Sequence, residues 1–197
     1  MSGPGDHPPG PASRLAPQAR AFFLSEENRD RRHRDIAWRN MTSFDLDAVN
    51  DIANQVHPDL FESRAVLAER QALYPNGCYL LEIGERPAGY VLSHPWHKGS
   101  LPALNVLLGE LPAGADTFYL HDLALLPVTR RIGAASFIVE ALLKHAAALG
   151  FATMHLVAVN GSRGFWERHG FAVAEDPGLA EKLRSYQDAA VYMARTL

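Results

Sequence analysis

A short segment near the middle of the chain has the residue types of an anion site. Residues 123–126 are apolar and read as the end of a β-strand, and Pro127 follows in a turn. Arg130, Gly133 and Ala135 then open an apolar helical stripe in the pattern Arg-x-x-Gly-x-Ala. The first backbone N–H groups of a helix have no intrahelical partner, and the helix dipole is positive there. The segment therefore predicts a phosphate or pyrophosphate site at the start of this helix.

The residues around the helix start suit close approach of such an anion. Gly133, Ala134 and Ala135 carry little or no side chain, so a phosphate can come near the amide groups, and Arg130 and Arg131 add positive charge. The structural alternative is that these small residues only permit tight packing of the helix on the strand. The sequence has no Gly-Lys-Ser or Gly-Lys-Thr and no G-x-G-x-x-G after this strand, which disfavours a P-loop and a dinucleotide site.

His121, on the strand before this helix, is the candidate general base. An amine has a pKa near ~10 and must lose a proton before it attacks, and histidine titrates close to neutral pH. Strand alternation predicts that Tyr119, His121 and Leu123 point to one face of the sheet and Asp122 to the other. A satisfied structural histidine is the alternative for His121, and Asp122 is expected to bond local backbone or an arginine.

Composition and charge are those of an ordinary globular protein. At 197 residues, of which 47% are hydrophobic, the chain is long enough for one domain with a sizeable core. Proline and glycine are dense in residues 1–34, so we expect a disordered tail followed by one domain over residues 35–197. The net charge of −3 gives no reason to expect a nucleic-acid partner.

Neither a membrane span nor a secretion signal is predicted. No apolar run approaches the roughly 20 residues that cross a bilayer, and the N-terminus lacks the basic and apolar regions of a signal peptide, so we expect a cytoplasmic protein. Cys78 is the only cysteine, which excludes an internal disulfide, and its apolar neighbours predict a buried thiol. His94 and His97 have metal-ligand spacing, but Pro95 precludes the helix that usually presents such a pair, so no metal site is predicted.

The order of periodic segments predicts an α/β domain around one mixed sheet, because strands and helices alternate along the chain. The expected order is β-α-α-β-β-β-α-β-α-β-β. The expected strands are residues 36–41, 78–83, 88–92, 118–126, 153–159, 171–174 and 189–194, and the expected helices are 46–56, 63–73, 132–149 and 162–168.

This order resembles that of the GNAT superfamily of acetyl-CoA-dependent N-acetyltransferases, over about residues 36–197. The family pattern at the fourth strand and third helix is Arg or Gln, two residues, Gly, one residue, then Gly or Ala, which the Arg-x-x-Gly-x-Ala segment matches. A second family element is Asn, a short helix, an aromatic pair and then Gly-Phe. Asn160, Phe165, Trp166 and Gly170-Phe171 match it. The two elements occur in the right order, which makes the resemblance much more specific than one glycine motif alone.

The resemblance implies a GNAT fold, a single domain with a mixed, mostly antiparallel, splayed sheet flanked by helices. It also implies acetyl-CoA as cosubstrate, with the pantetheine arm held by the backbone of the splayed strand. A backbone N–H near Leu125 then faces the thioester carbonyl and stabilises the oxyanion, and Asn160 bonds the arm from the other side. The implied coenzyme-binding residues are Leu123, Ala124, Leu125, Arg130, Arg131, Ile132, Gly133, Ala134, Ala135, Ser136, Asn160, Ser162 and Trp166.

Within the family, residues 119–125 look like the equivalent strand of the arylalkylamine (serotonin-type) N-acetyltransferases, which carry histidines at the positions matching 119 and 121. This chain keeps His121 as base and has Tyr119 at the first position. The family's usual acid, a tyrosine, falls at Trp166, whose indole N–H cannot act as an acid. Tyr119, Ser162 or water then remains as proton donor, and Trp166 either packs on the pantetheine arm or belongs to the core.

The long connection over residues 93–116 is expected to form a flap over the acceptor pocket, together with residues 56–61, because it is rich in leucine and tryptophan. An apolar flap favours the primary amine of a small apolar or aromatic molecule, which attacks the thioester directly. The residues expected to hold its ammonium group are Asp59, Glu82, Glu110 and Asp116. The alternative for the connection is extra core or a contact in a homodimer.

Two other functions fit the same sequence. One is a protein acetyltransferase acting on a lysine or an N-terminus, which an open groove instead of a covered pocket would favour. The other is a catalytically silent acyl-CoA-binding module, which Trp166 in place of tyrosine supports.

Overall fold

The computed structural model describes residues 36–197, so the predicted tail over residues 1–34 lies outside the described residues. One sheet of seven strands, in the order β1-β2-β3-β4-β5-β7-β6, forms the centre of the domain. The strands are β1 (Ile36–Asn40), β2 (Tyr79–Ile83), β3 (Arg86–Trp96), β4 (Thr117–Leu125), β5 (Thr153–Ala158), β6 (Ala172–Val173) and β7 (Val191–Thr196). The helices are α1 (Leu46–Val56), α2 (Arg64–Leu73), α3 (Ala134–Ala148), α4 (Arg163–Arg168) and α5 (Ala180–Tyr186).

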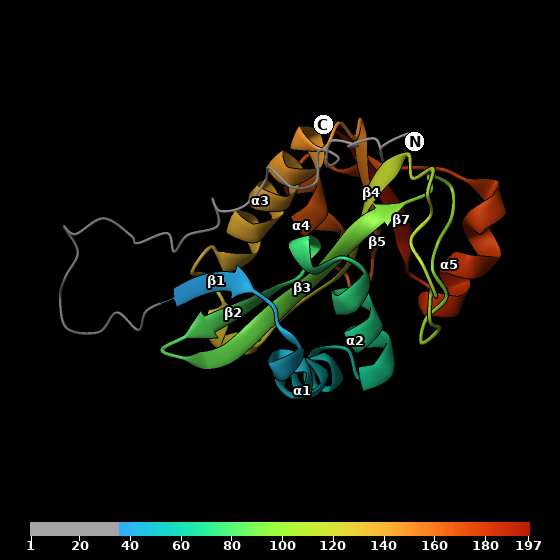
Figure 1. The fold of residues 1–197 in the computed structure, drawn as a ribbon. Helices are drawn as coiled ribbons and strands as arrows, with labels where there is room; N and C mark the ends of the chain where they lie inside the picture. The colour runs from blue at the N-terminus through green and yellow to red at the C-terminus, as the bar shows by residue number, and fades with distance from the viewer. Residues whose placement is uncertain (1–35) are drawn as a thin grey trace, which may run out of the picture.

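Helices cover both faces of the sheet, with α3 and α4 on one side and α1, α2 and α5 on the other (Figure 1). Leu142 of α3 and Trp166 of α4 share a core cluster with strands β4 and β5, whereas Val49 of α1 and Leu67 of α2 pack on β2 and β3 from the opposite side. This arrangement confirms the predicted α/β domain with one sheet flanked by helices. Within residues 36–197 every helix is too short or too polar to span a bilayer.

Local sequence signals account for most element boundaries. Thr42 and Asp45 form a capping box ahead of α1, and Ser63 stands at the N-cap of α2. Gly150, with a φ of 86°, follows the last turn of α3 in the left-handed conformation that ends helices. The helix α5 was not expected from the sequence. It is short, and Tyr186 anchors it to the 97–116 segment by donating its hydroxyl to the carbonyl of Pro102.

Strands β4 and β5 are the only parallel pair of the described sheet, and they separate after a short contact. They pair only over residues 118–120 and 154–156, although β4 continues to residue 125 and β5 to residue 158. All other pairs are antiparallel. The sheet is therefore mixed, mostly antiparallel and splayed, as the sequence predicted.

A β-bulge lies in β4 where the two strands begin to separate. Leu92 of β3 pairs with Asp122, and the next residue, Ser93, pairs with Leu120, so His121 is an extra residue on β4. A bulge of this kind shifts the side-chain alternation by one position.

This shift makes the predicted alternation wrong. Leu123 packs against the cluster of α3, whereas His121 contacts Glu62 and Asp122 contacts His57, both from the connection that follows α1. His121 and Asp122 therefore face the same side of the sheet, although they are consecutive in the strand.

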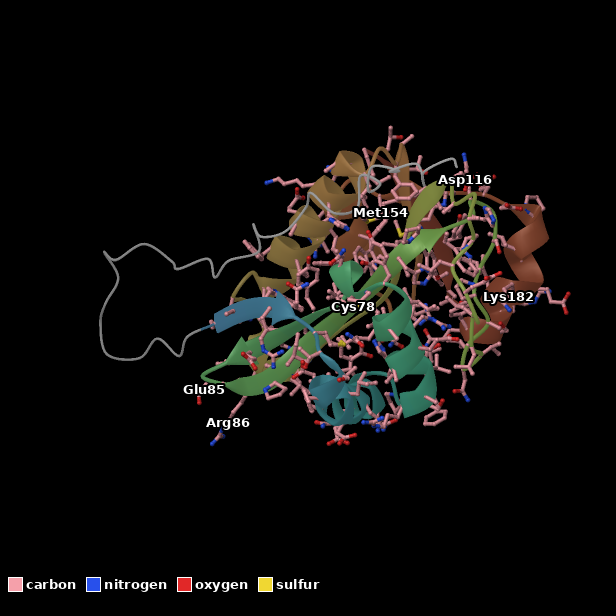
Figure 2. All side chains as sticks on the ribbon, viewed as in Figure 1. Cys78, Glu85, Arg86, Asp116, Met154 and Lys182 are labelled. Carbon is pink, nitrogen blue, oxygen red and sulfur yellow. The ribbon has the colours of Figure 1, made fainter. Side chains whose placement is uncertain are left out.

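Cys78 lies between α2 and the sheet, in the interior of the domain, while Glu85 and Arg86 project from the tip of the β2–β3 hairpin (Figure 2). Burial raises the pKa of the Cys78 thiol to about 12. The prediction of a buried thiol is confirmed, and the thiolate form that could act as a nucleophile is disfavoured.

The fold makes a first prediction for stability. Leu142 of α3 is 1% exposed and packs against β4 and β5. Leu142→Ala is expected to lower the free energy of unfolding by about 2–5 kcal/mol, because it removes apolar burial and leaves a cavity. Urea denaturation measures this change. Leu149→Ala is the matched control, since Leu149 is 37% exposed at the end of the same helix. An equal decrease in the free energy of unfolding for the two variants would contradict the packing of Leu142 against β4 and β5.

Candidate functional site

The start of α3 has the geometry of an anion site. Arg131 and Gly133 both have positive φ, at 67° and 77°, and Gly133 is the N-cap of the helix. The carbonyl of Gly133 accepts the first intrahelical bond, from Phe137, so the amides of residues 134–136 have no partner inside the helix. Residues 130–133 are exposed. Free amides, a helix dipole and two arginines converge there, as the sequence predicted.

The gap between β4 and β5 presents unpaired backbone groups of β4. The N–H of Leu126 donates to the carbonyl of Ala88 in β3 at 2.9 Å. Because amide directions alternate along a strand, the N–H of Ala124 also faces β3, and those of Leu123 and Leu125 face the opposite side. That side is the gap that β5 has left. The two N–H groups can therefore bind a thioester carbonyl or a pantetheine amide.

Asn160 stands at the other edge of the gap, just after β5, with a φ of 53°. Its backbone N–H donates to Oε1 of Gln187 at 2.9 Å, and its side-chain Oδ1 accepts from Nε2 of Gln187 at 2.6 Å. These two bonds fix the orientation of both amides. The Nδ2 group of Asn160 is then a donor to Nδ1 of His57, at 3.1 Å.

His121 forms a buried pair with Glu62, from the connection between α1 and α2. Nε2 of His121 lies 2.8 Å from Oε2 of Glu62, and the two side chains are 3% and 7% exposed. Burial raises the pKa of Glu62, but the charge and hydrogen bond of His121 outweigh burial, so the net pKa is lowered. The carboxylate is ionised and accepts the Nε2–H of His121.

In the neutral form of a His121 ring that donates from Nε2, Nδ1 carries the lone pair. Nδ1 is buried, and no group among residues 36–197 hydrogen-bonds to it. The neighbouring ring of His94 stays neutral, because burial, and a positive charge on His121 when that ring is protonated, lower the pKa of His94 to about 3. A carboxylate on one nitrogen of an imidazole stabilises the imidazolium that forms when the other nitrogen accepts a proton. The arrangement is therefore suited to general-base chemistry.

A second histidine–carboxylate pair lies beside the first. Nε2 of His57 is 3.0 Å from Oδ1 of Asp122, in an ion pair that is not aligned as a hydrogen bond, and the hydroxyl of Tyr90 donates to the other carboxylate oxygen. Burial lowers the pKa of His57, but the charge of Asp122 outweighs it, and the net pKa is raised. The expectation that Asp122 bonds local backbone or an arginine is wrong, because the bulge turns it toward His57.

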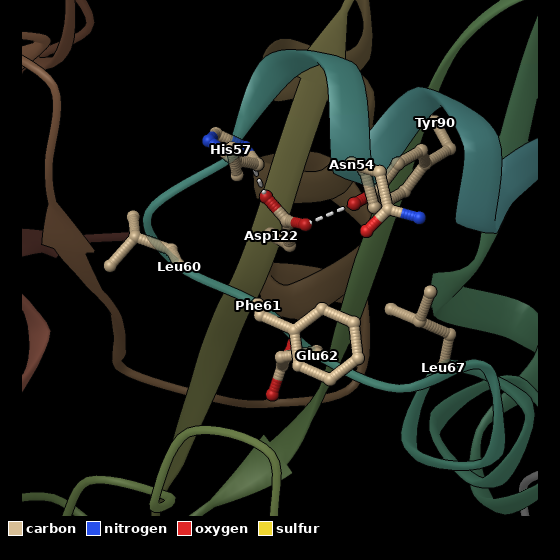
Figure 3. Close-up of a pocket in the computed structure, with 9 residues that line it drawn as sticks. Asn54, His57, Leu60, Phe61, Glu62, Leu67, Tyr90 and Asp122 are labelled. Atoms are coloured by element: carbon tan, nitrogen blue, oxygen red, sulfur yellow. Dashed lines mark hydrogen bonds and ion pairs between the residues drawn. The ribbon is translucent and has the colours of Figure 1, made fainter.

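Both carboxylates line one narrow pocket, whose cavity volume of about 10 Å³ is room for about one water molecule (Figure 3). Its polar wall contains His57, Glu62 and Asp122, and in the figure Phe61 lies across its front. The remaining lining residues are Ala53, Asn54, Leu60, Leu67 and Tyr90. The pocket thus places two carboxylates among apolar side chains, which suits a positively charged group of about the size of an ammonium.

The 97–116 segment is fastened over this side of the sheet by hydrogen bonds. The N–H of Asn105 donates to Glu62 at 3.3 Å, and its side chain accepts the N–H of Ser63 at 2.8 Å. Glu69 of α2 accepts the N–H groups of Leu108 and Gly109. The carboxylate that holds His121 is thus also bonded to the covering segment. The segment is bonded to the α1–α2 connection, but residues 97–116 supply none of the lining of the pocket, so a flap over an acceptor pocket stays a prediction.

The remaining predicted site residues lie deeper than the gap. The indole N–H of Trp166 donates to the Ser162 hydroxyl at 3.1 Å, and Trp166 is 6% exposed in the core cluster beneath α3. Of the two roles left open for Trp166, this placement favours the core. Tyr119 is 1% exposed and bonded to Tyr186, and burial raises its pKa well above 10. Ser136 is bonded to His169 at 3.0 Å.

The acidic residues that face the pocket are not those expected from the sequence. Glu82 pairs with Arg39 at 2.7 Å, and Asp116 accepts the backbone N–H of Lys98. Glu62 takes their place, and it was missed because nothing local distinguishes it from a surface glutamate. Only the turn between α1 and α2 brings it to β4.

Known proteins match both the sequence and the fold. Residues 46–171 match the model of the Acetyltransferase (GNAT) family. No curated protein is a significant match. Among solved structures, Ard1 from Thermoplasma volcanium is 15% identical with a TM-score of 0.64, covering 82% of this chain and 97% of its own.

Two further structures have the same fold. The loading GNATL domain of CurA from Lyngbya majuscula is 14% identical with a TM-score of 0.68, covering 82% of this chain and 97% of its own. The ribosomal-protein-S18-alanine N-acetyltransferase from Escherichia coli is 20% identical with a TM-score of 0.56, covering 82% and 93%. The family model covers well over half of the chain, and the splayed sheet and the α3 start agree with it. The chain belongs to the GNAT family of acetyltransferases, which use acetyl-CoA.

Proposed function

We propose that the protein transfers the acetyl group of acetyl-CoA to the primary amine of a small, apolar or aromatic molecule, by direct attack in a ternary complex. The observation that carries the proposal is the His121–Glu62 pair at the bulge of β4, where β4 stops pairing with β5, with a buried Nδ1 that no described residue bonds. A base with a free lone pair is what amine acetylation requires.

Each chemical task has a candidate group. The pyrophosphate of acetyl-CoA binds the amides of residues 134–136 with Arg130, and the pantetheine arm lies in the gap. The N–H groups of Leu123 and Leu125 face the thioester, and that of Leu125 stabilises the oxyanion. His121 does not line the pocket itself but is bonded through Nε2 to Glu62, which does. Its Nδ1 therefore takes the amine proton through one water.

The pocket favours an acceptor that carries one positive charge and an apolar body. Glu62 and Asp122 attract an ammonium group, while Leu60, Phe61 and Leu67 offer apolar contact. The 97–116 segment is bonded to Glu62, Ser63 and α2 beside this pocket, which supports a covered acceptor site rather than an open groove for an extended chain. We also propose that the acceptor resembles the substrates of the arylalkylamine-type N-acetyltransferases.

A panel of acceptors tests this function. Arylalkylamines and short alkylamines are expected to release free coenzyme A from acetyl-CoA faster than polyamines or peptides with free N-termini, because the pocket is small and apolar on one side. The readout is free thiol together with the mass of the acetylated amine. Hydrolysis of acetyl-CoA without acceptor is the background control.

Two results would favour a different function. Faster turnover with peptides would favour a protein N-terminal acetyltransferase, the class of the matched Escherichia coli structure. Binding of coenzyme A without turnover of any amine would favour a silent acyl-CoA-binding module.

A further inference from the structure

The departing coenzyme A thiolate needs a proton, and the two side chains predicted as its donor, Tyr119 and Ser162, already take part in hydrogen bonds. The indole N–H of Trp166 donates to the Ser162 hydroxyl, and Trp166 belongs to the core cluster beneath α3. Tyr119 is buried on the other face, bonded to Tyr186. A thiol has a pKa near ~8.5, so its thiolate is a tolerable leaving group, but a nearby acid still speeds its departure.

His57 spans the gap from which the thiolate leaves. One ring nitrogen contacts Asp122 on β4 at 3.0 Å, and the other contacts Asn160 after β5 at 3.1 Å. These are the two edges of the gap in which the pantetheine arm is proposed to lie. With a side chain 13% exposed, His57 also lines the pocket of Figure 3 and is more accessible than His121.

We propose that His57 is the general acid that protonates the sulfur of the departing coenzyme A. The inference rests on the proposed amine acetylation. The bound ammonium first loses one proton to His121, which passes it to solvent; the amine nitrogen then bonds to the carbonyl carbon and gives its second proton to His121. The C–S bond then breaks, its electron pair goes to sulfur, and the Nδ1–H of His57 supplies the proton of the thiol. Solvent exchange then deprotonates His121 and reprotonates His57.

The contacts of Asn160 determine when His57 can carry this proton. While Asn160 donates to Nδ1, the ring has its proton on Nε2, facing Asp122. When the pantetheine arm takes the amide of Asn160, Nδ1 is released and can be protonated. Asp122 and Glu62 favour the imidazolium more than burial disfavours it, so the pKa of His57 is raised above its ordinary value of 6.5. The other titratable groups near this pair are Tyr90 and His121, which act on Asp122.

His57→Gln tests the inference, because glutamine keeps a donor for Asp122 but cannot act as an acid. The measurement is kcat against pH, at saturating acetyl-CoA and an amine that the wild type acetylates. At neutral pH kcat is expected to fall about 100-fold. In the wild type, kcat is expected to decrease at high pH as His57 deprotonates. This decrease is expected to be absent from the pH profile of the variant. A wild-type profile in the variant overturns the inference.

Asp122→Asn provides a second test that keeps the imidazole. Removing the carboxylate charge lowers the pKa of His57, so the descending limb is expected to move to lower pH. An unmoved limb overturns the inference even if His57→Gln does not fold, and coenzyme A binding with the thermal midpoint reports folding of both variants. The proposed function fails if the wild type acetylates no amine. The acid assignment alone fails if the wild type acetylates amines but both variants keep the descending limb of the wild-type pH profile.

Discussion

Replacing His121 by glutamine is expected to lower kcat by about 10²- to 10⁴-fold, which is the usual contribution of a general base. Glutamine can donate from its amide to Glu62 as His121 does, so the buried carboxylate keeps a partner and the fold should persist. It has no nitrogen lone pair that accepts a proton at neutral pH. Steady-state kinetics with the best amine of the panel measures the effect. Binding of coenzyme A is expected to stay unchanged, because His121 lies on the acceptor side of the sheet.

Glu62→Gln is the matched comparison for this variant. It keeps the shape of the side chain and a hydrogen-bond acceptor for His121, but it removes the charge that stabilises the imidazolium. We expect a smaller loss of kcat than in His121→Gln. If His121→Gln turned over at the wild-type rate, His121 would be a satisfied structural histidine, and His57 would be the remaining imidazole in the pocket.

The coenzyme side of the site could be predicted from the sequence because it is local. Arg130, Gly133 and Ala135 follow one strand and open one helix, so their spacing alone specifies free amides and a positive φ at the turn. The predicted strands and helices agree with the structure mostly to within a few residues for the same reason. The short helix α5 is the exception, since packing on the 97–116 segment rather than its own periodicity accounts for it.

The acceptor side depends on contacts between distant residues, which one sequence does not reveal. Glu62 meets His121 across 59 positions of the chain, and His57 meets Asn160 across 103. The bulge at His121 has no signal in the residue types of β4, because it is a property of its pairing with β3. A regular strand would direct His121 and Asp122 to opposite faces. The bulge thus explains how two adjacent residues supply two histidine–carboxylate pairs to the same face.

Leu125→Pro is expected to lower kcat by about 10²- to 10³-fold, the cost of removing one oxyanion-hole donor. Proline lacks a backbone N–H, and the N–H of Leu125 faces the gap rather than β3, so no bond of the sheet is lost. The affinity for coenzyme A should change much less, because the pyrophosphate site at α3 is untouched. Kinetics and coenzyme A titration of the same preparation separate the two effects.

Two neighbouring substitutions make this prediction specific to one amide. Leu125→Ala removes the side chain and keeps the N–H, so it should retain most of kcat. Ala124→Pro removes an N–H that faces β3 in the middle of the sheet, so it should lower the thermal midpoint strongly. If Leu125→Pro instead lowered the midpoint as much as Ala124→Pro, the amide of Leu125 would belong to the sheet. The oxyanion would then have to be stabilised by Leu123, whose N–H faces the same gap.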